Sequence, residues 1–565
     1  MTRTDAPPAQ PLWITALARG LLAAAIGVVV VAVLLPNTWM AELRVQWRWF
    51  SEAINRVEAL WPAVDMVHVV MFGAVGVLAA LAFPAVRLGR LLLAIATLAC
   101  ATELAQIWVP GRTASVGEAV LDVVAGAAGV LLVAGLRRLG RWPALDKATR
   151  IAFLGGVLLL PLQDWGLVWL FGHGVSPADL LFVVALGLHG LTLLAGQAPL
   201  RGQPIHGAWL AYVLVLGFSI FVSPAVLSSF GKWIGVVHLT LLAVLALDLC
   251  AQAGFMRKTA MAWIIAASVT ALGSAVGLVG FYLAPGSPWL DWLLLSHYGS
   301  LPPGPWPRVT SLFANPNMLC NYLVVAVCLL LAAIRLQWIQ SRTGYALFLL
   351  LALASVFTAS PGLGGLALAV GLWCGWLWRD EAPRRAALVL GAGVFAAIAM
   401  FAATLVNLAA PFEQASVRGL IWPQAWATVL QHPWRGVGLG QDVVGVEFLS
   451  PSGDQQWLTD AHNMWLNLAG QAGLPAVLAM VAICWLLLRG PWPRSATGAG
   501  ETAVSEAAVS QAAVSETDIL RVACGTAFVG AFLYQGMAGS FEDARQMWLL
   551  MGMLAALAQH RTSSP

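Results

Sequence analysis

Long apolar runs separated by short polar turns recur along the whole of this chain of 565 residues. About sixteen of these runs are long enough to cross a hydrocarbon core of roughly 30 Å as a helix. Backbone polar groups inside lipid must pair within their own segment, and runs rich in Leu, Ala, Val and Gly do so as helices. The pattern predicts an all-α, polytopic membrane protein with about 16 transmembrane helices.

Composition supports the same class, because 60% of the residues are hydrophobic and 10% are charged. Such a balance excludes a water-soluble globule. The formal net charge of +4 is spread over many loops without a basic cluster, so we expect no nucleic-acid partner. The first apolar run, residues 14–35, is too long for the core of a signal peptide and lacks a convincing cleavage site, so we expect a retained span.

Lysine and arginine gather in alternate loops, which predicts that both termini are cytoplasmic. This topology puts the longest polar interval, residues 411–466, on the outer side together with the Pro/Trp-rich residues 284–317. A site on that face would have no access to cytoplasmic nucleotides. The loops expected inside carry Arg87, Arg90, Arg137, Arg138, Arg141, Lys147, Arg150, Arg201, Arg257, Lys258, Arg335, Arg342, Arg379, Arg384, Arg385, Arg489 and Arg494.

A basic run at residues 137–150, which contains Gly140 and Pro143, suggests a domain boundary. We expect a four-helix membrane domain at residues 1–142 and a larger membrane domain at 143–565. Residues 495–518 repeat AVSEA, AVSQA and AVSET, which favours a flexible cytoplasmic linker. The seven cysteines show no metal-site or disulfide spacing, so we expect them to pack in the core.

The first domain carries ionisable and amide side chains near the outer ends of its predicted helices. Such groups at membrane depth are costly and suggest a functional site. Two interpretations stay open: Glu103, Gln106 and Arg112 lock three helices together, or the set forms a pocket for a lipid head group or a glycan. The full set is Asp65, His68, Glu103, Gln106, Arg112 and Asp122.

These residues follow an ordered pattern of D-x-x-H, E-x-x-Q, VPGR and E-x-x-x-D across residues 41–136. The pattern resembles the VanZ-like family of small membrane modules. One departure is LDVVAGAAG, which replaces the usual Asn-rich end of the fourth helix. The resemblance implies an association with glycopeptide resistance and no particular chemistry.

Three polar stretches of the second half fall on the expected outer face, at residues 308–321, 418–440 and 460–467. Tryptophans at helical spacing in the second stretch favour the membrane interface. Arg418 is a permanent, forked donor suited to phosphate, and His462 titrates near neutrality and suits a general base. The purely structural alternatives are that Arg418 anchors a surface helix to lipid phosphates and that His462 caps or packs a helix.

These stretches contain R-x-x-S-x-F-x-N-P-N from Arg308, R-x-x-x-W-x-x-A from Arg418, P-x-x-G-x-G from Pro433, and His462–Asn463 followed by Gln-Ala-Gly. Their order resembles the O-antigen ligase and polymerase superfamily of membrane glycosyltransferases, over about residues 301–551. The resemblance implies an enzyme of the bacterial inner membrane that takes a glycan from undecaprenyl pyrophosphate. Transfer would invert the anomeric carbon, without a metal or cofactor, in the assembly of O-antigen, exopolysaccharide or capsule.

The resemblance also implies partners and roles for individual residues. The acceptor would be lipid A core or another glycan, and further partners would be membrane lipids and proteins of polysaccharide assembly and export. His462 would be the base, Arg418 the first choice for the pyrophosphate and Arg308 the second. Asp460 would orient His462 if the local backbone allows it. Substrate-binding candidates are Asn463, Trp422, Asn317, His432 and Arg435, although His432, Arg435 and Asn317 equally suit loop and turn architecture.

One departure from that superfamily concerns donor binding. A Ser-Arg pair is usual in a T-x-S-R context, but residues 357–365 read FTASPGLGG, so Pro361 follows Ser360. Either another residue supplies the cation, or this protein uses a different donor. A catalytically inactive scaffold for glycan assembly is a further interpretation. A transporter or lipid-binding protein is a further alternative, which the crowding of polar residues on one face disfavours. The motifs do not separate a ligase from a polymerase, because the two share a donor.

Overall fold

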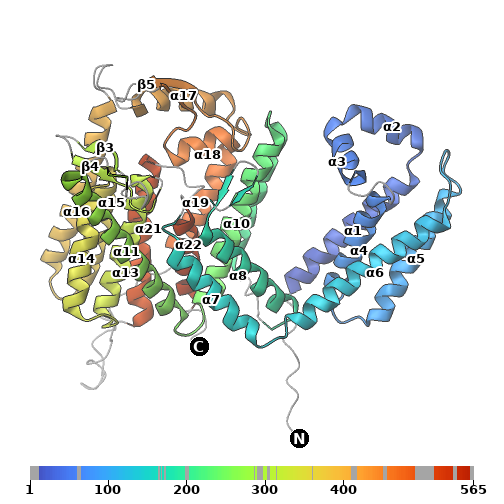
Figure 1. The fold of residues 1–565 in the computed structure, drawn as a ribbon, viewed down its shortest axis with the longest axis horizontal. Coiled ribbons are helices and arrows are strands. Elements are labelled where there is room, and N and C mark those ends of the chain that lie inside the picture. Colours follow the sequence, from blue (N-terminus) through green and yellow to red (C-terminus); the bar gives the residue numbers. More distant parts are fainter. Residues whose placement is uncertain are drawn as a thin grey trace, which may run out of the picture. The chain divides into compact units, whose positions relative to one another are not determined.

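The computed structural model describes residues 12–59, 65–162, 166, 168–170, 173–197, 203–284, 287–288, 297–301, 306–313, 315–358, 360–408, 417–449, 455–489, 515–538 and 544–559. Residues 411–416 and 450–454 of the expected outer loop and residues 495–514 of the expected linker lie outside these ranges. The chain packs as two compact units (Figure 1). Unit 1 comprises Met1–Thr149 with Gly187–Gly202, and unit 2 comprises Arg150–Leu186 with Gln203–Pro565.

Helices dominate the described residues, which confirms the all-α membrane class predicted from the sequence. Nine described helices are long and apolar enough to cross a membrane, and five more are apolar but shorter. The sequence suggested about 16 spans, a larger number than this part of the chain displays. Strands are confined there to three two-stranded antiparallel hairpins.

Unit 1 is a helical group with two short helices at one end. Its elements are α1 (Leu12–Leu34), α2 (Asn37–Gln46), α3 (Arg48–Glu58), α4 (Met66–Ala82), α5 (Leu88–Gln106) and α6 (Val116–Leu139); α7 (Ala144–Leu159) follows.

Glycine lets α4 and α6 approach each other closely in unit 1. A Cβ at Gly76 would lie 2.0 Å from the carbonyl oxygen of Gly126, and one at Gly129 would lie 2.3 Å from that of Gly73. Small residues of this kind drive helix association in lipid, where burial of apolar surface supplies no net force. The two helices also carry His68 and Asp122, so this contact sets the spacing of the polar residues at their first turns.

Unit 2 begins at Arg150 within α7 and contains most of the chain, while the C-terminal part of α8 belongs to unit 1. The hairpins pair Val168 with Val175, His297 with Val309, and Val446 with Leu458 at their open ends. Its elements are β1 (Val168–Leu170), β2 (His173–Val175), α8 (Pro177–Leu194), α9 (Pro204–Ser219), η1 (Ile220–Val222), α10 (Val226–Cys250), α11 (Phe255–Leu283), β3 (His297–Leu301), β4 (Trp306–Val309), α13 (Pro316–Arg335), α14 (Ser341–Val356), α15 (Ser360–Trp378), α16 (Pro383–Leu408), α17 (Val417–Gln431), β5 (Val446–Leu449), β6 (Gln455–Leu458), α18 (Met464–Ala472), α19 (Leu474–Leu488), α21 (Glu516–Ala538) and α22 (Arg545–Gln559).

The core of unit 2 is built around α13. In the most apolar 18-residue stretch of this helix, 78% of the residues are buried. A helix that is apolar all round is expected at the centre of a bundle, and α13 packs against α21, α14, α15 and α11. Cys250, Cys320, Cys328 and Cys524 are buried there as free thiols. This agrees with the packing role predicted for them, although Cys100 is exposed.

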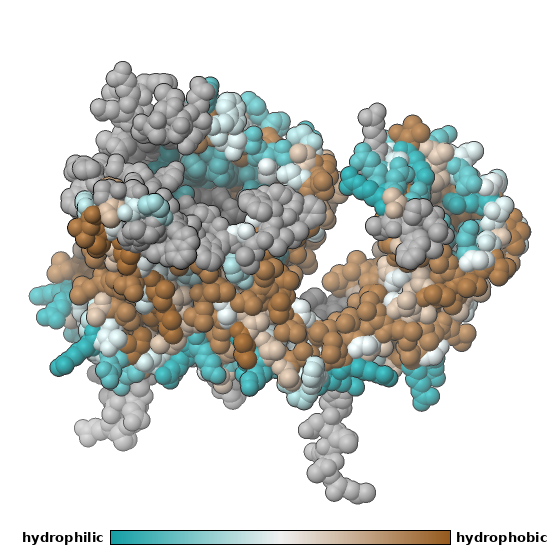
Figure 2. All heavy atoms as spheres, viewed as in Figure 1, coloured by the Kyte–Doolittle hydropathy of each residue, from teal (hydrophilic) through white to brown (hydrophobic). Residues whose placement is uncertain are grey.

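Hydrophobic residues form a band across the helices of each unit, with hydrophilic residues at the helix ends (Figure 2). In unit 2, α17 and the hairpins β3–β4 and β5–β6 lie together at one end of the helical body (Figure 1). On the face drawn in Figure 2, hydrophilic residues line a hollow below α17. The polar segments are thus gathered at one rim of unit 2.

The close approach of α4 and α6 predicts opposite effects for two glycine substitutions in α6. Gly129→Ala would force the helices apart, which should lower stability by about 1–3 kcal/mol. Gly135→Ala meets nothing within 4 Å and should be neutral or raise stability by up to about 1 kcal/mol through helix propensity. Thermal unfolding of the purified chain in detergent measures both, and equal midpoints would contradict this packing.

Candidate functional site

Arg418 and Trp422 lie one turn apart on α17 and therefore on one face of that helix. The indole Nε1 of Trp422 donates to the carbonyl oxygen of Ala461 at 3.0 Å, and Ala461 N donates to Asn467 Oδ1 at 2.8 Å. We call this arrangement of Trp422, Ala461 and Asn467 the α17–α18 clamp. It brings the helix that carries Arg418 against the residue next to His462.

A small cluster of buried apolar side chains packs next to the α17–α18 clamp. Ile421 and Ala425 of α17 are fully buried against Val443, Val444 and Ala461. Because Ala461 is buried and hydrogen-bonded at both its N–H and its carbonyl, its peptide groups have little freedom. The side chain of the following residue, His462, therefore projects from a fixed backbone.

His462 has a φ of 47°, in the left-handed region that side chains other than glycine seldom adopt. Strain of this kind tends to persist at functional sites, where the surrounding contacts impose it. Its Nδ1 lies 3.6 Å from Asp460 Oδ1, and the His462 side chain is 44% exposed. The backbone N–H of His462 also donates to Asp460 Oδ1. Asp460 therefore lies beside the imidazole, but the oxygen nearest the ring accepts from the backbone N–H of His462.

The cap of α18 is Asn463, not His462. Asn463 Oδ1 accepts from Trp465 N at 3.0 Å and from Leu466 N at 3.2 Å. The capping alternative for His462 is therefore wrong, and the side-chain oxygen of Asn463 is committed to the helix. Asn467 is buried within the clamp, and the sequence analysis assigned it no role.

His432 and Arg435 belong to a different part of unit 2. They follow the C-terminal end of α17, roughly 20 Å along the helix axis from Arg418 at 1.5 Å per residue. The Gly-rich turn that contains them is hydrogen-bonded to the end of α18, where the Gln-Ala-Gly sequence of residues 471–473 lies. Val437 N donates to the Gly470 carbonyl at 2.9 Å. Gly436 has a φ of 64°, and a Cβ there would lie 2.3 Å from the Gln471 backbone. This arrangement is the loop architecture considered for them.

Arg308 joins three chain segments at the start of α13. Its Nε donates to the Thr358 carbonyl at 2.8 Å, and its Nη2 donates to Asn317 Oδ1 at 2.9 Å. Asn315 caps α13 by accepting from Asn317 N, so the Asn-Pro-Asn turn shapes the helix start as the turn interpretation requires. Thr358 lies just before α15, the helix in which Pro361 stands where arginine was expected.

A buried polar layer that the sequence did not predict joins the first turns of α8 and α22 to the second turn of α13. Arg545 binds Asp179 through two hydrogen bonds of 2.7 and 2.8 Å, and His238 Nε2 lies 3.5 Å from the same carboxylate. Gln546 donates to Asn321 Oδ1 at 3.2 Å. Asp179, Arg545 and Gln546 can each be seen in the sequence as polar residues near the starts of apolar helices. No sequence pattern, however, pairs Asp179 with Arg545, which lies 366 positions further along the chain.

The polar set of unit 1 is divided by the structure. His68 Nδ1 lies 2.9 Å from Asp122 Oδ1, while Glu103 Oε2 accepts from Ser115 N at 2.9 Å. Asp65 caps α4, and Gln106 is buried in the last turn of α5. Arg112 donates to the main-chain carbonyls of Ala32 and Leu35. Arg112 therefore locks helices together, as one of the two interpretations proposed.

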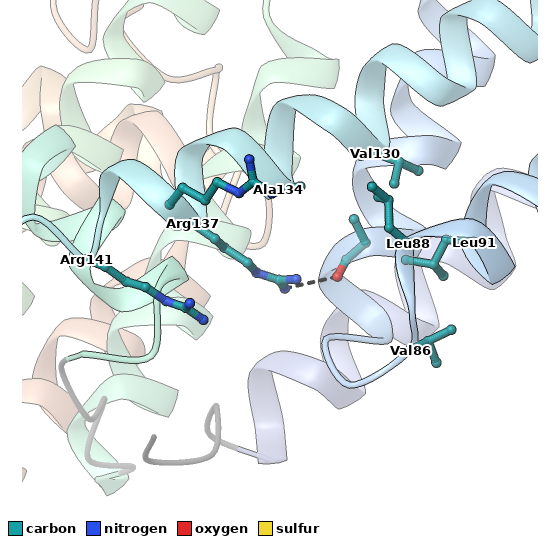
Figure 3. A pocket seen from close by; sticks show the side chains of 9 residues that line it. Val86, Leu88, Leu91, Val130, Ala134, Arg137 and Arg141 are labelled. Carbon is teal, nitrogen blue, oxygen red and sulfur yellow. Dashed lines mark hydrogen bonds between the residues drawn. The ribbon is translucent and has the colours of Figure 1, made fainter. Parts of the chain in front are cut away.

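A cavity of about 200 Å³ opens at the other ends of the same helices, lined by cations and apolar side chains (Figure 3). Arg137 reaches the carbonyl of Ala80 at 3.0 Å. Residues 122 and 137 of α6 are separated by roughly 22 Å of helix, so this cavity is distinct from the acidic end of unit 1. The lining residues are Ala80, Val86, Leu88, Leu91, Val130, Ala134, Arg137, Arg138 and Arg141.

Comparisons with known proteins divide the chain in a similar way. Residues 327–481 match the family model described as O-antigen ligase, and residues 21–137 match the model described as VanZ/LLP1. The first range includes Arg418 and His462 and excludes Arg308. Both resemblances expected from the motifs are confirmed. The chain is a multi-pass membrane protein in which one segment is similar to the O-antigen ligase family and another to the VanZ-like family.

A curated O-antigen ligase from Pseudomonas aeruginosa is 27% identical to this chain over 294 residues. The match covers 52% of this chain and 66% of that relative. No solved structure matches.

The buried Asp179–Arg545 pair predicts a large effect for removal of one partner. Arg545→Gln leaves the Asp179 carboxylate buried without its bidentate partner and should cost about 3–5 kcal/mol. Arg44→Gln removes an ion pair of equal length, 2.7 Å, whose side chains are 37% and 46% exposed, and should cost less than about 1 kcal/mol.

Thermal unfolding in detergent compares these two variants. Adding Asp179→Asn to Arg545→Gln should recover part of the loss, because the double variant no longer buries a charge. Equal losses for the buried and the exposed pair would contradict this account of unit 2.

Proposed function

We propose that this protein transfers a glycan from an undecaprenyl-pyrophosphate carrier to an acceptor hydroxyl at the outer face of the bacterial inner membrane. The product belongs to surface polysaccharide, and the acceptor is lipid A core or a second glycan. The observation that carries the proposal is the α17–α18 clamp, which brings a permanent cation and an exposed, strained histidine to one rim of unit 2. The match of residues 327–481 to the O-antigen ligase model supports the same reaction.

The proposed reaction is a single displacement without a metal. His462 accepts the proton of the acceptor hydroxyl, and the oxygen attacks the anomeric carbon from the side opposite the phosphate. The bond from that carbon to the phosphate oxygen breaks, and the pyrophosphate leaves with the electron pair. The product is therefore inverted at the anomeric carbon. A positioned base of this kind contributes roughly 10²–10⁴-fold to the rate.

Arg418 is proposed to bind the departing pyrophosphate, because a guanidinium offers parallel donors to phosphate oxygens and keeps its charge. Arg308 is proposed to supply the second cation. Its guanidinium lies at the Thr358 carbonyl, next to the helix start where Pro361 replaces the expected arginine. The first turns of α13 and α15 meet there, and the N-terminal ends of helices favour anions.

Asn463, Trp422 and Asn317 are proposed to shape the substrate site, with Trp422 acting through the clamp. His432 and Arg435 contact substrate only if the glycan extends along α17. We further propose that both termini lie in the cytoplasm and that the two domains span residues 1–142 and 143–565. A transporter or a non-catalytic scaffold of polysaccharide export remains the alternative function, since Pro361 departs from the superfamily pattern.

Substitution of His462 tests the proposal. In a deletion strain complemented with variants, His462→Ala should lower glycan transfer by about 10²–10⁴-fold. The half-exposed side chain predicts unchanged folding. Arg418→Ala should be similarly impaired, and Arg418→Lys should recover part of the activity, because lysine keeps the charge but loses the fork. Carrier-linked glycan should accumulate as surface polymer falls.

Leu430→Ala is the matched control, since it truncates a side chain that is 63% exposed near the other end of α17 and has no proposed contact with substrate. It should leave polymer amount and length unchanged. Full activity of His462→Ala would contradict the assignment of His462 as the general base. A deletion strain with normal surface glycan and normal carrier-linked intermediates would overturn the whole proposal.

The expected topology generates a separate prediction. A cysteine at Glu447 in β5 should react with a membrane-impermeant maleimide added to intact cells whose outer membrane has been permeabilised. A cysteine at Glu381, in the exposed turn between α15 and α16, should react only after the inner membrane is opened. The wild-type chain controls for native thiols. The reverse pattern would put the clamp on the cytoplasmic side, away from the proposed donor.

A further inference from the structure

Three side chains of unit 1 converge as metal ligands usually do. One ligand atom each from His68, Glu103 and Glu118 lies within 4.8 Å of the other two. They come from α4, α5 and α6, so the group joins the first turns of α4 and α6 to the last turn of α5. Their separations in sequence, 35 and 15 residues, match no metal-binding motif, and the sequence analysis expected no metal.

The orientation of His68 is set by a carboxylate. Its Nδ1 lies 2.9 Å from Oδ1 of Asp122, which is fully buried. A carboxylate accepts hydrogen bonds, so in the neutral imidazole Nδ1 carries the proton and Nε2 keeps the lone pair. Histidines that bind metals are commonly held by such a carboxylate, which fixes the tautomer and raises the basicity of the ligating nitrogen.

Glu103 provides an independent indication of a ligand. The residue is 5% exposed, and its Oε2 accepts from Ser115 N. Its Oε1 is buried and has no hydrogen-bond partner within the described ranges of the chain. Oδ2 of Asp122 is likewise buried without a hydrogen-bond partner among the described residues. Buried carboxylate oxygens almost always have a donor or a cation, so Oε1 of Glu103 has room for a partner that the described residues do not supply.

Charge also favours a cation at this place. Glu103, Glu118 and Asp122 lie around one imidazole, and the guanidinium of Arg112 donates to the main-chain carbonyls of Ala32 and Leu35. We propose that His68, Glu103 and Glu118 bind a divalent transition-metal ion, Zn²⁺ in the first place and Mn²⁺ in the second. Imidazole with two carboxylates suits these ions. Three protein ligands leave a further position on the metal for water or another oxygen ligand.

Metal binding by the purified, tag-free full chain in detergent tests this site. The bound metal is first removed with a chelator, and the protein is reloaded with Zn²⁺ or Mn²⁺. Elemental mass spectrometry should then find one metal ion per chain. Glu103→Gln and His68→Gln should each weaken binding by at least 100-fold. Asp122→Asn, which changes the group behind His68, should weaken it by about 10–100-fold.

Glu58→Gln is the matched control, because it removes an exposed acid of the same unit. It should bind as tightly as the wild type. The metal should raise the thermal midpoint of the wild type and of Glu58→Gln but not that of Glu103→Gln. The metal-free midpoint of Glu103→Gln should be no lower than that of the wild type, since an amide replaces a buried charge. A wild type that retains no stoichiometric Zn²⁺ or Mn²⁺, or equal affinity in Glu103→Gln, would overturn the proposal.

Discussion

The bidentate pair of Arg545 and Asp179 is the interaction on which the polar end of unit 2 depends. A carboxylate and a guanidinium in a mostly apolar body are tolerated only when each satisfies the other. Here Ser176 also donates to Asp179 through both its N–H and its hydroxyl. The pair therefore anchors the first turn of the last helix to the first turn of α8, and neighbouring Gln546 extends the layer to Asn321 in α13.

Arg308 lies near the start of the same central helix. Asn317 accepts from Arg308, and Asn321, one turn further along, accepts from Gln546. One face of α13 thus connects Arg308 with the last described helix, α22. The layer gives unit 2 a rigid rim, and the α17–α18 clamp adds a second, separately packed piece that carries Arg418 and His462. A rigid frame of this kind is what positioned catalysis requires.

Unit 1 has two chemically opposite ends. Close packing of α4 on α6 through glycine holds acids and one imidazole at one end, while the C-terminal end of α6 lines a cavity with three arginines. Membrane helices with charges at both ends are common, but the acidic end is distinguished by its burial and by two carboxylate oxygens that find no donor among the described residues. The cationic cavity instead agrees with the charge bias that orients membrane proteins.

Sequence alone determined the class of this protein, the order of its motifs and both family resemblances, because these depend on local composition and on short fixed spacings. It also suggested Arg418, His462 and the polar set of unit 1 as candidates, one residue at a time. The tertiary structure decided which of them meet. Trp422 joins Ala461 across 39 positions and Arg545 joins Asp179 across 366, while His432 and Arg435 are removed from Arg418 by the length of one helix. The left-handed backbone of His462 and the donorless oxygen of Glu103 were equally hidden, since both arise from packing against segments remote in the chain.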